Sequence, residues 1–420
     1  MAKRRSSTTP KIPKKKPKVS VSASYDLRSK RSSSTRTPQK KQVQVEEAIS
    51  IKIKTPTLKH YNKTPNSIFS TNSPRETTRF FISVKPIQSR CPDLFKSKNC
   101  NDDHPLHLAA AGGHLSIVES LITNAFQFAI SSGRASEAGL QEVLNVIKGQ
   151  NKQGNTPLHL AVAAGHLPIA KSLFMRAASP SCFPNLEKKS PLYMAAEAGY
   201  LELFELMMQY VASNVDAQNM LKDSEPLLHV AITTRNKVVL ETALKYVSSL
   251  LDAPDTKGKK PLSYAASIGY VDGVCYILDT FVDCTYQRDD DGSYPIHEAS
   301  SQGHIDVVKE FLRCFPDSRE LLNERGQNIL HVAAESGKAN IVSYMLKDPE
   351  LEMLINDTDE DGNTPLLLAT KNAHAEIVSI LTWDKRVRSE IVNCDGFTAL
   401  EVALDYVGYH PSIHQVLLLL

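Results

Sequence analysis

An apolar residue returns at a nearly constant interval along most of the chain after residue 100. Seven of the eight intervals are 34 or 36 residues, and each return opens a short stretch with the apolar spacing of a helix, followed by a second such stretch. A repeat of this length predicts units of two antiparallel helices, each too small to bury its apolar face alone and therefore stacked on its neighbours. The recurring positions are Leu106, Leu158, Leu192, Leu228, Leu262, Ile296, Leu330, Leu366 and Leu400.

The clearest copy of the repeat is the phrase Asn-Thr-Pro-Leu-His-Leu-Ala at residues 155–161. Thr156 is suited to cap a helix, Pro157 to occupy its first position, and Leu158 to face the neighbouring unit. Gly165 follows where a helix commonly ends in the left-handed conformation. The motif residues that we single out are Thr156, Pro157, Leu158, His159, Ala161 and Gly165, with Thr364 and Pro365 repeating the cap in a later copy.

Both the period and this phrase resemble the ankyrin repeat. The resemblance implies an all-α solenoid in which a turn precedes each pair of helices. Turns such as Asp291-Gly292 and Asp361-Gly362 are expected to form short β-hairpin fingers. The fingers and the first helices would then make a concave surface that binds other proteins.

The sequence divides into three segments. Residues 1–78 are predicted to be a disordered basic tail rich in Ser, Thr and Pro, and residues 79–100 a degenerate N-terminal cap. Residues 101–420 hold the nine motifs. The first interval is 18 residues longer than the period, which places an insertion at about 125–149 that should extend the second helix of the first unit or its loop.

The basic tail carries most of the positive charge. Its first 60 residues contain 17 Lys and Arg against three acidic residues, whereas the other 360 residues have a net charge of −11. Two basic clusters have a spacing close to that of a bipartite nuclear import signal, and they could equally bind nucleic acid or an anionic membrane surface. A tail that only increases solubility is the third interpretation. The clusters consist of Lys3, Arg4, Arg5, Lys14, Lys15, Lys16 and Lys18.

A histidine follows the recurring apolar residue in five copies, at His107, His159, His229, His297 and His331. Because these positions are one or more repeats apart, their side chains are not expected to converge on one metal ion or substrate. The other copies replace the histidine, with Tyr193, Ser263, Leu367 and Glu401. A shared catalytic role would not tolerate this variation. The family resemblance implies a structural role, a hydrogen bond to the neighbouring repeat.

Motifs for catalysis and metal binding are weak. Residues 357–362 match the first half of a calcium loop, but its twelfth position is Leu368, which has no carboxylate. Residues 287–298 are a second partial match to a calcium loop, with the required Glu298 at the twelfth position but Gln287 at the first. The sequence contains no phosphate-binding loop, nucleophile elbow, zinc-protease helix or kinase signature. We therefore expect neither enzyme activity nor a metal or other cofactor.

Cysteine usage and hydropathy give weaker information. The seven cysteines are scattered singly, which favours a reducing compartment. No apolar run approaches the ~18 residues that span a bilayer. Met207, Met208 and Trp383 fall in helical apolar patterns and are predicted to be core residues.

The C-terminal third resembles a particular plant family. Residues 322–334, 359–366 and 380–384 are similar to stretches of the plant ankyrin–transmembrane proteins of the accelerated cell death type. The resemblance implies defence and cell-death signalling through protein partners at the cytosolic face of the plasma membrane. That family continues into transmembrane helices, which this chain does not reach. A soluble scaffold that the tail directs to the nucleus, or one in the cytoplasm, is therefore the alternative.

The last five residues, 416–420, are apolar and would cap a repeat array poorly. We expect this end to associate with a partner or with a second copy, or to be continued by further residues.

Overall fold

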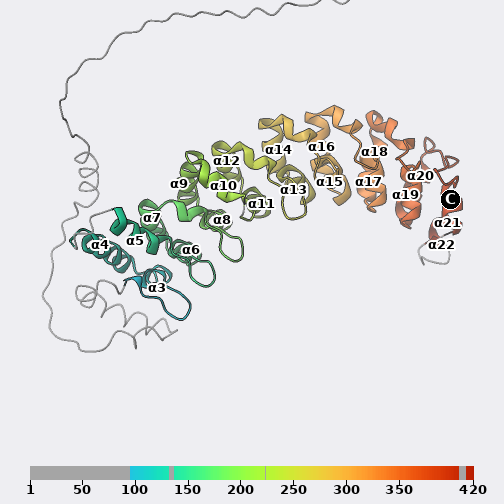
Figure 1. Ribbon diagram of the computed structural model, residues 1–420. Helices are drawn as coiled ribbons and strands as arrows, with labels where there is room; N and C mark the ends of the chain where they lie inside the picture. The colour runs from blue at the N-terminus through green and yellow to red at the C-terminus, as the bar shows by residue number, and fades with distance from the viewer. Residues whose placement is uncertain (1–94, 132–136, 223, 406–412) are drawn as a thin grey trace, which may run out of the picture. The chain divides into compact units, whose positions relative to one another are not determined.

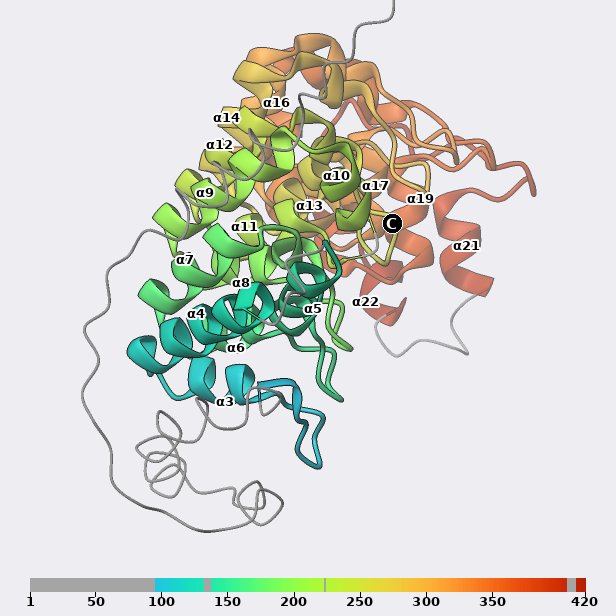
Figure 2. The same cartoon turned by 60° about the vertical axis from the view of Figure 1, so that its left-hand side comes forward.

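The computed structural model describes residues 95–131, 137–222, 224–405 and 413–420, which belong to one unit of the chain. The regular elements of these residues are all helices, which confirms the all-α fold. Figures 1 and 2 show the helices following one another in chain order along the array. The basic tail with its Lys and Arg clusters, and residues 79–94 of the expected cap, lie outside the described residues.

Each recurring apolar residue lies in the first helix of a pair, and the first helices form one layer. Every first helix packs against the next, from α3 on α6 to α19 on α21. These helices are α3 (Pro105–Ala111), α6 (Pro157–Ala163), α8 (Pro191–Glu197), α11 (Leu227–Thr233), α13 (Pro261–Ser267), α15 (Pro295–Gln302), α17 (Ile329–Glu335), α19 (Pro365–Lys371) and α21 (Ala399–Asp405).

The second helices form the other layer and likewise pack each on the next. They are α4 (Leu115–Ser131), α7 (Leu167–Arg176), α9 (Leu201–Ala212), α12 (Lys237–Tyr246), α14 (Val271–Thr280), α16 (Ile305–Cys314), α18 (Ala339–Lys347), α20 (Ala375–Trp383) and α22 (Ile413–Leu417). Short 3-10 helices follow several of them: η3 (Ser179–Cys182), η4 (Ser248–Asp252), η5 (Val282–Tyr286), η6 (Pro316–Glu320) and η7 (Pro349–Asn356).

The core is continuous along the array because each unit buries its apolar face against the next. The third residue after the recurring apolar position is Ala in all nine units, and each of these alanines is buried. A methyl group at this position lets neighbouring first helices approach closely, so the stack tolerates no larger side chain there without moving the backbones apart.

Two units depart from the repeat. The insertion predicted at about 125–149 lengthens α4 and adds α5 (Glu137–Lys148), which packs on α4. Val143, Val146 and Ile147 of α5 are buried and line a small apolar cavity together with Leu121 and Ile122 of α4. In the fourth unit, α10 (Val215–Leu221) stands where neighbouring units have a short 3-10 helix, and it packs on α9 and η3, which was not predicted from the sequence.

The finger turns contain no regular strand in the part of the chain that the structure describes. Each is closed by backbone hydrogen bonds of hairpin type, such as Asp359 N–H to the Asn363 carbonyl at 3.0 Å. The residue at the tip has a positive φ in eight units. These tip residues are Asp102, Gly154, Lys188, Gly258, Gly292, Gly326, Gly362 and Gly396.

Among the described helices, none is long and apolar enough to cross a membrane.

Candidate protein-binding surface

The motif residues build the start of each first helix. In α6, the Thr156 hydroxyl accepts the backbone N–H of His159, and Pro157 occupies the first helical position. Leu158 and Ala161 are buried against the neighbouring units. Gly165 has φ +72° just after the helix. In the later copy, the Thr364 hydroxyl accepts the Leu367 N–H at 3.3 Å and Pro365 begins α19.

The motif histidine connects its own helix cap to the next unit. Nδ1 of His159 accepts the Thr156 backbone N–H at 3.0 Å, and Nε2 lies 3.2 Å from the Lys189 carbonyl before α8. Since Nδ1 accepts, Nε2 carries the proton and donates to that carbonyl. Burial, which disfavours the charged imidazolium, lowers the pKa of His159 to about 4. The ring is therefore neutral near pH 7.

The other motif histidines have the same contact, each at a different junction between units. Their Nε2 atoms lie 2.9 or 3.0 Å from a carbonyl of the following unit: His107 from Asn155, His229 from Lys259, His297 from Gln327 and His331 from Asn363. Because each ring is occupied at its own junction, the arrangement positions repeats relative to one another and offers no shared binding centre.

A row of Asn and Asp residues, which was not predicted from the sequence, shapes the fingers. The residue seven positions before the recurring apolar residue accepts the backbone N–H groups two and four residues later, as Asn151 does from Gln153 and Asn155 at 3.0 Å. This pattern recurs at Asn99, Asn185, Asp255, Asn323, Asp359 and Asn393. The spacing of these residues in the sequence was the signal that could have revealed them.

A second row of histidines, also missed, binds the preceding unit. Nε2 of His166 lies 3.2 Å from the Ala111 carbonyl, His304 lies 3.0 Å from the Ser267 carbonyl, and His374 lies 3.0 Å from the Glu335 carbonyl. Both histidine rows therefore hold the fingers and helix ends in register, which keeps the exposed surface rigid.

The exposed fingers change in charge along the array. Those before α13 expose Lys152, Lys188 and Lys257, together with Glu187. Those from α15 onward expose mainly acidic side chains, with Arg325 as the exception: Asp290, Asp291, Glu324, Glu360, Asp361 and Asp395. A partner that contacts the whole finger row would meet both signs of charge.

Trp383 is not a core residue, so this prediction was wrong, whereas Met207 and Met208 are fully buried. Trp383 is 83% exposed because the buried face of α20 consists of Ile377, Val378 and Leu381. The equivalent position in five other units is an exposed polar or charged residue: Gln209, Lys245, Asp279, Arg313 and Lys347. Among the described second helices before α20, only α7 has an exposed apolar residue at this position, Met175, which is 75% exposed. A large exposed indole at a position otherwise kept polar is typical of a contact with a partner.

The edge of the array at α21 also exposes apolar side chains. Leu400 is 44% exposed and Leu404 57% exposed. The residues at these two positions in the preceding eight units are buried, because each unit is covered by the next. The same stacking surface therefore faces solvent at α21.

Comparison with known proteins agrees with this architecture. The sequence pattern described as Ankyrin repeats (3 copies) matches residues 72–183, 132–219, 192–288 and 281–357. The chain is also similar to the protein ACCELERATED CELL DEATH 6 of Arabidopsis thaliana, with 35% identity over 341 residues. This match covers 79% of the chain and 50% of the relative, so the chain spans about half the length of the curated relative it matches.

Proposed function

This chain belongs to the ankyrin-repeat family, and from that membership we propose that it is a non-enzymatic scaffold in plant defence or cell-death signalling at the cytosolic face of the plasma membrane. Ankyrin repeats are protein–protein interaction modules, and the predicted resemblance to the accelerated cell death type is confirmed by the identity with the Arabidopsis protein. The role in cell death rests on what the name of that relative says, and the role in defence and the membrane location are inferences from the family resemblance.

The exposed Trp383 is the observation that carries the binding role. An indole left in water presents a large apolar surface, and its burial by a partner would contribute about 2 kcal/mol or more to binding. Truncating it should leave the fold intact, because its side chain lies outside the buried face of α20.

The test is transient expression of the full chain in leaf tissue, with ion leakage as the measure of cell death. We expect the wild-type chain to change leakage relative to an empty vector, and Trp383→Ser to remove most of this effect at equal protein level. Lys347→Ser, at the equivalent position of α18, is the matched control and should behave as wild type. If the wild-type chain has no effect on leakage, the proposed role in cell death is wrong. If Trp383→Ser acts as strongly as wild type, the assignment of the binding surface is wrong.

A soluble scaffold in the nucleus or bound to nucleic acid is the second candidate, favoured by the 17 basic residues among the first 60. A fluorescent fusion with and without residues 1–42 separates the two. Nuclear signal that disappears on deletion supports this candidate, whereas peripheral signal that is unaffected supports the plasma membrane.

We also propose that the exposed apolar face of α21 binds a second copy of the chain. The support is that Leu400 and Leu404 continue the surface on which α19 and α21 already pack. Light scattering should show the wild-type chain becoming dimeric with rising concentration and Leu404→Glu remaining monomeric. A wild-type chain that stays monomeric throughout contradicts the proposal.

A further inference from the structure

One junction between units lacks the motif histidine and has an unusual polar interior. Ser263 of α13 stands where five other units place an imidazole that reaches the next finger. Its hydroxyl is fully buried next to the carboxyl of Asp289, without a hydrogen bond of good geometry within the described residues. At three of the other junctions Nδ1 of the histidine accepts the N–H two residues before the recurring apolar residue, as His159 does from Thr156. Here the carboxyl of Asp289 accepts that N–H, from Lys260.

Asp289, at the base of that finger, is oriented differently from its counterparts. Seven equivalent Asn and Asp residues bind backbone N–H groups of their own turn, but Oδ1 of Asp289 accepts the Lys260 N–H of the preceding unit at 2.9 Å. Its Oδ2 is buried and has no hydrogen-bond partner within the described part of the chain. Burial raises the pKa of this carboxyl to about 6, although the nearby Ser263 hydroxyl acts in the opposite direction. A buried carboxylate oxygen without a donor is unfavourable unless a ligand compensates it.

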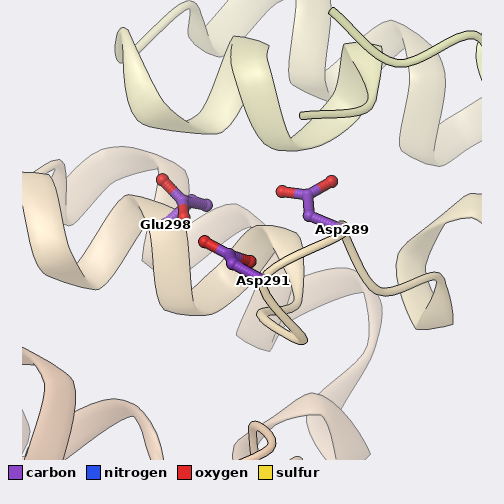
Figure 3. Close-up of side chains that lie close together, drawn as sticks. All are labelled: Asp289, Asp291 and Glu298. Carbon is purple, nitrogen blue, oxygen red and sulfur yellow. The ribbon is translucent and has the colours of Figure 1, made fainter. Parts of the chain in front are cut away.

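Two further carboxylates face Asp289 at this point. One oxygen each of Asp289, Asp291 and Glu298 lie within 4.8 Å of one another, with Asp291 from the fingertip and Glu298 from the first turn of α15 (Figure 3). Glu298 is paired through one oxygen with Lys259 of the preceding unit. The cluster thus sets one ammonium group against three carboxylates. Asp291 is exposed, so the cluster is accessible from solvent.

We propose that Asp289, Asp291 and Glu298 bind a hard divalent cation, Ca²⁺ in preference to Mg²⁺, between the fifth and sixth units. Carboxylate oxygens are the ligands these ions prefer. Ca²⁺ accepts oxygen ligands in a flexible geometry, whereas Mg²⁺ requires a near-ideal octahedron, so three carboxylates from a finger and a helix suit Ca²⁺ better. Water completes the coordination on the side of Asp291. The bound ion joins the finger to α15 within the sixth unit, beside Lys259 of the fifth unit.

Isothermal titration calorimetry of the full chain with CaCl₂, and separately with MgCl₂, tests this. Wild type should bind one Ca²⁺ with a dissociation constant on the order of 10⁻⁴–10⁻³ M, and Mg²⁺ more weakly. Asp291→Asn should bind Ca²⁺ at least tenfold more weakly. Asp291 is exposed, so the substitution should leave the fold and the circular dichroism spectrum unchanged.

The matched control is Asp290→Asn, which removes a carboxylate from the same finger but outside the cluster, and it should bind as wild type. A second variant, Ser263→His, restores the imidazole of the other junctions. It should weaken Ca²⁺ binding at least tenfold because the ring would accept the Lys260 N–H and displace the carboxyl of Asp289. Absence of Ca²⁺ binding by wild type overturns the proposal, as does equal binding by Asp290→Asn and Asp291→Asn, or undiminished binding by Ser263→His.

Discussion

Acidification should destabilise the junction between α6 and α8, because His159 is held neutral in the folded chain. Nδ1 already accepts the Thr156 N–H, so a proton there breaks the hydrogen bond that orders the helix cap. In the unfolded chain the same imidazole is free in water and has the ordinary pKa of about 6.5. Burial is the main cause of the lowered pKa in the folded chain, and the imidazole of His107 in the preceding unit acts in the same direction, because two protonated rings would repel each other.

The size of this effect follows from the two pKa values. A histidine whose folded pKa is lower than its unfolded pKa binds fewer protons when folded, so stability falls as the pH decreases below 6.5 and the fall ends near pH 4. Between pH 6.5 and pH 5, about 1.5 pH units at about 1.4 kcal/mol per unit lower the free energy of unfolding by about 2 kcal/mol. Above pH 7 both states are neutral and the contribution vanishes.

Urea unfolding followed by circular dichroism at pH 5, 6 and 7 measures this loss, with His159→Gln as the comparison. The variant should be less stable than wild type at pH 7, because it loses the ring between two units. This difference should shrink by about 2 kcal/mol at pH 5, since glutamine does not titrate. A difference between wild type and variant that is independent of pH would refute the assignment of a neutral buried imidazole.

Three further predictions concern the repeat geometry and use the same unfolding measurement. Ala373 has φ +55° where most units have glycine after the first helix, so Ala373→Gly should stabilise the fold by about 0.5–1 kcal/mol. The control Ala369→Gly, within α19, should instead destabilise the fold by at least about 1 kcal/mol. Gly362→Ala should destabilise by at least about 1 kcal/mol more than Gly396→Ala, because a Cβ at Gly362 would lie 2.8 Å from the Cys394 nitrogen, while one at Gly396 meets nothing within 4 Å. Thr364→Ala should cost about 1 kcal/mol through loss of the helix cap, against less than about 0.5 kcal/mol for the exposed Thr358→Ala.

The sequence predicted the array because its defining contacts are local or recur at a fixed spacing. Thr156 caps its helix by accepting an N–H only three residues later in the sequence, and an apolar residue recurs at the position of Leu158 in every unit. Both features are therefore visible without any structure. The row of finger Asn and Asp residues is equally periodic. It was missed because Asn and Asp are common in turns, and their repetition becomes informative only when the units are aligned on their recurring apolar residue.

Other features depend on which face of a helix is covered, and the sequence does not specify that locally. Trp383 was assigned to the core because its helix is apolar throughout, with little contrast between its faces. Alignment with Lys347 and Arg313, the equivalent residues of α18 and α16, places it on the exposed side. The helix α10 was not predictable for a different reason, since it stands in place of a short 3-10 helix while the interval between recurring residues stays at 36.

The residue after the recurring apolar position determines the chemistry of each junction between units. Where it is histidine, as at His159, a neutral ring joins two backbones and the junction weakens in acid. Where it is Leu367, the side chain is buried and the junction is apolar, so neither protons nor cations should act on it. Where it is Ser263, the carboxyl of Asp289 accepts the N–H that the ring accepts elsewhere, and the proposed cation site lies beside the junction. Because stability in a repeat array is a sum of contributions from neighbouring units, substitutions at this one position can change the solution conditions under which part of the array opens without changing the fold.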